Sequence, residues 1–194
     1  MADGDANARE EDHEVEGGTE GEAPAIPSDE VAAALVERFP DGVFAESHGQ
    51  PVVYVPLGEW HDVAAFLRDE QEFTQCVDVT GVDLLVAPSR ALPEGVTGER
   101  FEVVANFLSH ARNRRIRVIA QVPVDDPTIA SITDLYPGVN FAERETYDLY
   151  GVEFAGHPDL ARILMPDDWV GHPLRKDDAP ARVPVTFKGD PSPR

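Results

Sequence analysis

Cysteine is almost absent from this sequence, since Cys76 is the only one in 194 residues. A single thiol excludes an internal disulfide framework, and it cannot ligate an iron–sulfur cluster, which takes several cysteines. The scarcity of cysteine fits a reducing compartment. The chain also lacks an apolar run of the roughly 20 residues that a membrane-spanning helix needs. We therefore expect any contact with a membrane to be indirect.

Positive charge is scarce as well. Lys and Arg number 16 against 37 Asp and Glu, which gives a formal net charge of −21. Because nucleic-acid binding needs clustered cations to neutralise phosphates, we expect no nucleic-acid partner. The sequence contains no G-x-G-x-x-G motif, no P-loop and no recognisable nucleophile–base set. It predicts no catalytic centre, no metal site and no bound cofactor in this chain.

The acidic residues are concentrated at the start of the chain. Residues 1–30 hold eleven acidic side chains against Arg9 alone, a net charge of −10. This stretch has too few apolar side chains to offset the entropy lost on ordering. It has neither the basic start nor the apolar run of a signal peptide. We predict a disordered acidic tail at residues 1–27. A solubilising role is the interpretation that we favour, and a partner-binding role stays open as the alternative.

Residues 28–140 have the pattern of an α+β domain. Ser28 is placed to cap the first helix, and Trp60 and Cys76 are expected to be buried. The predicted elements are a helix at 28–39, a strand at 51–56, a helix from Trp60 to Leu67, strands at 76–86, 100–108 and 115–124, and a helix at 128–135. Short links between the three long strands favour an antiparallel meander flanked by helices.

Residues 141–194 have a different composition. Asn140 is placed to cap a helix through FAERETYDLY, with Glu143 at the capping-box position and Gly151 as the C-terminal stop. From Gly151 onward, seven of the 17 prolines occur, with glycines between them. Such a segment makes few backbone hydrogen bonds of its own. We predict an extended C-terminal arm that is either disordered or laid along another surface.

Carboxylates and histidines near this helix suggest two kinds of chemistry. Glu145 and Asp148 share a helix face and, with His157, could form an acid/base set. The simpler interpretation, which we favour, is that these carboxylates receive arginines. His157 and His172 each lie in a Gly-His-Pro tripeptide, which is typical of a tight turn and offers too few donors for zinc.

The run from Glu143 to Asp177 resembles the signature of the C-subunit family of respiratory complex I. The similar residues are Glu143-Arg144-Glu145, Asp148, Gly151, Phe154, Gly156-His157-Pro158, Leu160, Arg162, Met165-Pro166-Asp167-Asp168-Trp169, Gly171-His172-Pro173 and Arg175-Lys176-Asp177. Looser similarity extends the match to about residues 72–189. One departure is that Asp178 and Ala179 stand where the family has an aromatic residue before proline. The aromatic anchor of the family is therefore missing at that point.

The resemblance implies a non-catalytic, peripheral-arm subunit of a proton-translocating NADH–quinone oxidoreductase. FMN, iron–sulfur clusters and quinone would be bound by other subunits. The implied partners are the quinone-site subunit, called the D subunit, and other hydrophilic-arm subunits, at the cytoplasmic face of the cell membrane. The residues expected to contact partners are Glu143, Arg144, Glu145, Asp148, Phe154, His157, Arg162, Asp167, Asp168, Trp169, His172, Arg175, Lys176, Asp177 and Phe187.

Two other interpretations stay open on the sequence alone. The same module occurs in related membrane-bound hydrogenase and coenzyme-dependent dehydrogenase complexes, whose electron donors bind elsewhere. A different class is a free-standing enzyme that uses Glu145, Asp148 and His157. Co-purification in a large complex would favour the first, and a stable monomer with pH-dependent hydrolytic activity would favour the second.

Overall fold

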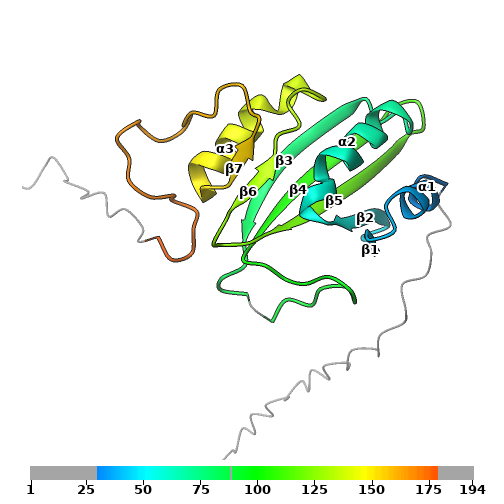
Figure 1. The fold of residues 1–194 in the computed structure, drawn as a ribbon, viewed down its shortest axis with the longest axis horizontal. Helices are drawn as coiled ribbons and strands as arrows, with labels where there is room; N and C mark the ends of the chain where they lie inside the picture. Colours follow the sequence, from blue (N-terminus) through cyan, green and yellow to red (C-terminus); the bar gives the residue numbers. More distant parts are fainter. Residues whose placement is uncertain (1–29, 88, 179–194) are drawn as a thin grey trace, which may run out of the picture.

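A computed structural model describes residues 30–87 and 89–178 of the chain (Figure 1). The predicted acidic tail, the Ser28 cap and Phe187 lie outside these residues. The described helices are α1 (Glu30–Arg38), α2 (Trp60–Asp69) and α3 (Asn140–Tyr150), with 3-10 turns η1 (Leu57–Glu59) and η2 (Pro137–Val139). The described strands are β1 (Val43–Ser47), β2 (Gln50–Val55), β3 (Gln75–Asp83), β4 (Phe101–Ser109), β5 (Arg114–Val122), β6 (Thr128–Ala130) and β7 (Glu153–Ala155).

Five of these strands form one mixed sheet in the order β1-β2-β5-β4-β3. The predicted antiparallel meander is confirmed, because β3 pairs with β4 and β4 pairs with β5 in antiparallel register. The α+β class is confirmed as well. One pairing was not predicted: β2 runs parallel to β5, with Val53 opposite Val118. The last strand of the meander returns beside β2, and the short hairpin strand β1 then closes that edge.

The core lies between this sheet and the helices α1 and α2, which cover one of its faces (Figure 1). Alternate residues of strand β4, from Phe101 to Phe107, are buried against them. Leu35 of α1 and Trp60 of α2 are also buried, so the expected place of Trp60 in the core is confirmed. Cys76 is half-buried, and burial raises the pKa of its thiol to about 12.

The helix predicted at residues 128–135 is wrong. Residues Thr128–Ala130 form strand β6 instead, which pairs in parallel with β7 and places Ile129 opposite Phe154. Both of these side chains are buried. Local helix signals were overridden because β-branched residues gain more from pairing with a strand that follows some twenty residues later.

The hairpin strand β1 was missed because its turn signal is uncommon. His48 and Gly49 both have positive φ angles, 54° and 72°, as a two-residue type I′ turn requires. The dipeptides that usually signal this turn are Asn-Gly, Asp-Gly and Gly-Gly. The His-Gly dipeptide was therefore a weak predictor of a hairpin.

The start of α3 also differs from prediction. Asn140 belongs to the first helical turn, and the residue before the helix, Val139, makes no side-chain cap. Glu143 does not form a capping box. Its buried carboxylate accepts hydrogen bonds from the Ser131 hydroxyl (2.6 Å) and the Ile132 amide (2.9 Å). The predicted stop is confirmed, since Gly151 has a left-handed φ of 71°.

Helix α3 packs directly on β3 at Gly81. A Cβ atom added to Gly81 would lie 2.8 Å from Cδ2 of Tyr150 and 3.0 Å from Cγ2 of Thr146. The Thr146 hydroxyl also donates to the carbonyl oxygen of Val79 at 3.5 Å. The absent side chain at Gly81 therefore allows α3 to approach the sheet. The boundary expected between 28–140 and 141–194 stays a prediction, and α3 begins at residue 140.

We predict that Gly81→Ala lowers the free energy of unfolding by about 1–3 kcal/mol, because the added methyl group overpacks the contact with α3. Gly58→Ala is the matched control, since nothing lies within 4 Å of a Cβ at Gly58. Urea denaturation of the full chain measures both. Equal stability of the two variants would contradict this account of how α3 is seated.

Candidate interaction surface after helix α3

The chain after β7 turns back over the C-terminal half of α3. We call residues 156–178 the returning segment, which has no regular secondary structure. Its main attachment is Asp148, whose side chain is fully buried. One carboxylate oxygen of Asp148 accepts from the Arg162 guanidinium at 2.7 Å. The other accepts from the three consecutive amides of Ile163 (3.0 Å), Leu164 (2.8 Å) and Met165 (2.9 Å).

These four donors determine the charge state of Asp148. Burial by itself would raise the pKa of this carboxyl group, but the hydrogen bonds from the Met165 and Leu164 amides, the Arg162 side chain and the Ile163 amide outweigh it. The net result is a pKa below the ordinary value. Asp148 is therefore held as an anion whose lone pairs are occupied within its own chain.

The returning segment also satisfies the carbonyl groups that α3 leaves open at its C-terminus. The ring of His172 lies 3.0 Å from the Asp148 carbonyl oxygen, and the Leu174 amide donates to the Leu149 carbonyl at 3.0 Å. The Arg175 guanidinium donates to the Tyr150 carbonyl at 2.5 Å. Cations at this end of a helix are also favoured by the helix dipole.

A second attachment joins the end of the returning segment to the sheet. Asp83, at the end of β3, accepts from Arg100 at 3.0 Å and from the Lys176 amide at 2.8 Å. Arg100 in turn pairs with Asp177. Burial by itself would raise the pKa of Asp83. The hydrogen bonds from Arg100 and from the Lys176 and Leu85 amides outweigh it, so the pKa lies below the ordinary value.

Asp83 and Arg100 were not among the predicted site residues. The available signal was a charged residue at the end of β3 and another directly before the start of β4. That signal does not identify a partner almost a hundred residues away in the sequence.

The prediction of an arm without partners in its own chain is therefore wrong for residues 156–178. Composition suggested this because proline and glycine limit regular backbone pairing. In the structure, the carboxylates of Asp148 and Asp83 accept hydrogen bonds from backbone amides of the segment. These amides therefore need no neighbouring strand or helix. The alternative prediction, that the arginines close the arm against carboxylates of α3, is confirmed for Arg162 and Asp148.

The other predicted residues fall into two groups. Glu143 and Phe154 are buried in this chain's own fold, Phe154 with an exposed fraction of 2 %. Phe154 was expected as an anchor for a partner, and it serves the core instead. Arg144 donates to the Ala161 carbonyl at 2.9 Å and so supports the returning segment. The second group is exposed or half-buried on the outside: Glu145, Asp167, Asp168, Trp169, Lys176 and Asp177.

An acid/base site is not assembled from Glu145, Asp148 and His157. Both oxygens of Asp148 are occupied, and Glu145 is exposed. The His157 ring bonds the Asn140 carbonyl at 3.3 Å, at the opposite end of α3. Asn140 and Asp148 are separated by about 12 Å along the helix axis at 1.5 Å per residue. The alternative of a free-standing hydrolase therefore has no acid/base set built from these three residues.

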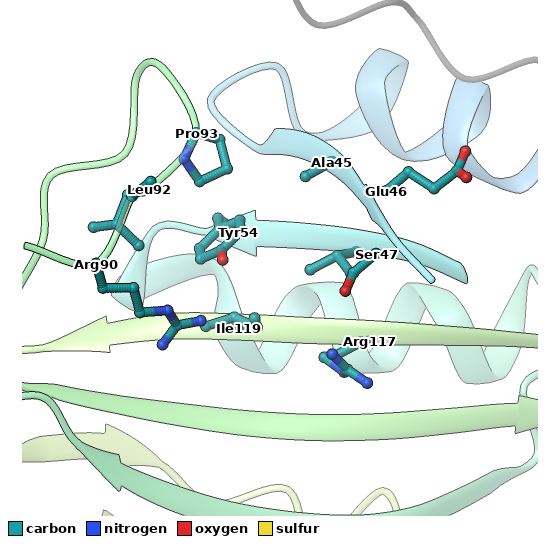
Figure 2. A pocket seen from close by; sticks show the side chains of 11 residues that line it. Ala45, Glu46, Ser47, Tyr54, Arg90, Leu92, Pro93, Arg117 and Ile119 are labelled. Carbon is teal, nitrogen blue, oxygen red and sulfur yellow. The ribbon is translucent and has the colours of Figure 1, made fainter. Parts of the chain in front are cut away.

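A hollow of about 330 Å³ lies elsewhere, on the sheet face opposite α1 and α2 (Figure 2). The apolar side chains that line it include Val52, Ile119, Leu92 and Pro93, and the guanidinium groups of Arg90 and Arg117 are also part of its lining. The hollow contains none of the predicted site residues.

Within residues 30–87 and 89–178, no group of three or more His, Cys, Asp or Glu side chains is arranged to hold a metal ion. Over the same residues, none of the helices has the length and apolar character needed to cross a membrane.

Comparison with known proteins gives consistent matches. Residues 53–183 match the family described as "Respiratory-chain NADH dehydrogenase, 30 Kd subunit". The C subunit of the NADH-quinone oxidoreductase of Salinispora arenicola is 41 % identical over 170 residues, which cover 83 % of this chain and 65 % of that protein. The corresponding C subunit of Roseiflexus castenholzii is 41 % identical over 157 residues, which cover 79 % of this chain and 84 % of that one.

Two solved structures share the fold. A trypsin-resistant fragment of Nqo5 is 31 % identical, with a TM-score of 0.58, and the match covers 67 % of this chain and 99 % of the fragment. A chain of the membrane-bound sulfane sulfur reductase, an archaeal respiratory membrane complex, has the same TM-score of 0.58 at 21 % identity. That match covers 72 % of this chain and 76 % of the other, and it shows similarity of fold alone.

We predict that Asp148→Asn destabilises the chain by about 3 kcal/mol at pH 7, because it removes a buried charge that Arg162 and three amides are placed to meet. Since folding lowers the pKa of Asp148, its stabilisation is present above the ordinary pKa of 3.8 and is lost as pH falls through the folded-state pKa. The difference between variant and wild type should therefore shrink below pH 3.8.

Denaturant titrations at several pH values measure this difference. Asp168→Asn, at an exposed position in the same segment, is the control and should change stability by less than about 0.5 kcal/mol. If Asp148→Asn had the same free energy of unfolding as the wild type at pH 7, the carboxylate would not be what holds the returning segment.

Proposed function

Because this chain belongs to the family of the 30 kDa subunit of respiratory-chain NADH dehydrogenase, we propose that it is a non-catalytic, peripheral-arm subunit of a proton-translocating NADH–quinone oxidoreductase. Its relatives are named as the C subunit of that multisubunit enzyme. The chain spans 65 % of the length of the Salinispora arenicola relative, so the activity of the whole complex enters as part of this proposal.

In the proposed role, the chain binds the quinone-site D subunit through the outer side of the returning segment. The inner side of this segment is already occupied by Asp148, by the open end of α3 and by Asp83. These contacts hold the segment in one shape before a partner arrives, which lowers the entropy lost on binding. A preformed docking surface of this kind suits a permanent subunit.

The observation that carries the proposal is the apolar character of that outer side. Large apolar side chains that are exposed in α3 and the returning segment are Phe141, Leu164, Val170 and Leu174. Val170 has an exposed fraction of 92 %. Trp169 is half-buried beside them in the sequence. Large exposed apolar side chains gathered in one segment are typical of a surface that a partner covers.

Charged residues accompany this apolar surface. Asp167 and Asp168 form a turn next to Trp169, and Lys176 of the same segment and Glu145 of α3 are exposed. In the proposed complex they form the polar rim, where charges set register and association rate more than affinity. The partner contacts predicted for His157, His172 and Arg175 are indirect here, since these side chains support the segment from within.

This function requires no chemistry of the chain itself. Flavin, iron–sulfur clusters and quinone are placed on other subunits, and this chain contributes by keeping the quinone-site subunit in position. The complex is placed at the cytoplasmic face of the cell membrane, to which the chain is held through its partners. Relatives at about 40 % identity that are named NADH-quinone oxidoreductase favour this complex over a hydrogenase or coenzyme-dependent dehydrogenase.

We predict that Val170→Asp lowers the amount of the quinone-site subunit recovered with the tagged chain at least tenfold, because it places a charge where an apolar contact is proposed; this corresponds to about 1.4 kcal/mol or more. The measurement is affinity purification from gently solubilised membranes, with subunits identified and NADH–quinone oxidoreductase activity measured per tagged chain. Val86→Asp is the matched control, since Val86 is also an exposed valine, with an exposed fraction of 70 %.

Undiminished recovery of the quinone-site subunit with Val170→Asp would place the docking surface elsewhere on the chain. Recovery of the wild-type chain without any respiratory subunit would overturn the proposed function itself. Equal losses with both valine variants would point to a general effect of the added charge, and would also count against this surface.

A further inference from the structure

Two arginines stand out on the sheet face opposite α1 and α2. Arg115 and Arg117 lie two residues apart on β5, opposite Leu108 and Asn106 of β4. The residues that alternate with them, Ile116 and Val118, are buried on the helix side. Arg115 and Arg117 therefore project from the same face of the sheet, the one that α1 and α2 do not cover.

Neither guanidinium group pairs with a carboxylate among residues 30–87 and 89–178. Arg117 donates only to the Asn106 side-chain oxygen, at 3.3 Å. Carboxylates lie within 4 Å of Arg68, Arg90, Arg100, Arg112 and Arg162. Arg144 and Arg175 donate to backbone carbonyl groups instead. In a chain with 37 acidic residues against 16 cations, two neighbouring arginines without an acidic partner indicate a surface reserved for an anion that lies outside the described residues.

The face is also shaped to receive a chain. Arg117 lines the hollow of about 330 Å³ described above, together with Val52 and Ile119 (Figure 2). On the side of the loop after β3, Leu92 and Pro93 line it. Glu46 also lines the hollow, and Arg90 is paired with Glu102, so the cation that it offers is Arg117. An apolar floor beside this guanidinium group suits an acidic polypeptide segment better than a free small anion.

We propose that the occupant is the acidic segment at residues 10–16 of this same chain, which docks across Arg115 and Arg117. Its sequence, EEDHEVE, places carboxylates at alternate positions: Glu10, Asp12, Glu14 and Glu16. In an extended backbone, alternate side chains point to one side at a repeat of about 6.6 Å. The two arginines repeat at the same interval on β5, so successive carboxylates meet successive guanidinium groups.

The length of the intervening chain allows this docking. Residues 17–29 separate Glu16 from the start of α1 at Glu30, and thirteen extended residues span about 45 Å. The five-stranded sheet is only about 19 Å wide at 4.8 Å per strand spacing. Helix α1 lies beside β1 and β2 (Figure 1), so the path around the sheet edge is short. Because the segment is tethered, its effective concentration at the face is high.

The consequence is that the acidic segment covers a basic, partly apolar face that would otherwise attract other acidic chains. This inference concerns a face distinct from the returning segment and does not depend on the proposed function. A second copy of this chain is the competing occupant, and the experiment separates the two.

The test is zero-length carbodiimide cross-linking of the purified full-length chain. The variant R115K keeps the charge and introduces a primary amine that can couple to a carboxylate in contact with it. R68K is the matched control, since Arg68 lies on α2 and contacts Asp69. Cross-linked peptides are quantified by mass spectrometry. We expect at least fivefold more coupling to residues 10–16 from R115K than from R68K at low salt.

Three further results are expected. The yield from R115K falls severalfold at about 0.5 M salt, where charges are screened within a few ångströms. It falls similarly when E10Q, D12N, E14Q and E16Q are combined with R115K. A mixture of isotope-labelled and unlabelled chains gives cross-links within one chain. Equal yields from R115K and R68K, or cross-links only between chains, would overturn the proposal, the latter in favour of a second copy as occupant.

Discussion

The buried carboxylate of Asp148 is the interaction on which the architecture of the C-terminal half depends. It collects one guanidinium and three backbone amides from residues 162–165 and thereby replaces the hydrogen bonds that a strand or helix would have supplied. A buried anion is costly unless its bonds are all met. This need for hydrogen-bond donors also makes the fold of the returning segment specific, because few other paths of the chain would bring four donors to the carboxylate.

The position of Asp148 follows from the packing of α3. Gly81 allows the helix to approach β3, and the hydrogen bonds of Glu143 to Ser131 and Ile132 fix its first turns against β6. Burial raises the pKa of Glu143 to about 6, so its ionised form depends on those two donors. Helix, sheet and returning segment thus form one folded unit, in which the buried carboxylates of Asp148, Glu143 and Asp83 are hydrogen-bonded and apolar side chains such as Val170 are exposed.

The sequence predicts regular elements well where burial alternates with the period of the element. The meander, the core helix with Trp60 and the stop at Gly151 follow from local pattern and are confirmed. The errors share one physical cause, which is long-range pairing that local propensity does not encode. Strand β6 exists because β7 lies beside it, and Glu143 bonds Ser131 rather than its own helix end. Likewise, composition identified the returning segment as unusual but did not reveal that Asp148 and Asp83 hold it within the chain.

The central claim is that residues 163–165 are bonded to Asp148 in the isolated chain, before any partner binds. Hydrogen–deuterium exchange of the Ile163, Leu164 and Met165 amides in the purified full-length protein tests it most directly. The account predicts that these three amides exchange at least about a hundredfold more slowly than in an unstructured peptide. Exchange at unstructured rates, with protection gained only on assembly with other subunits, would contradict it.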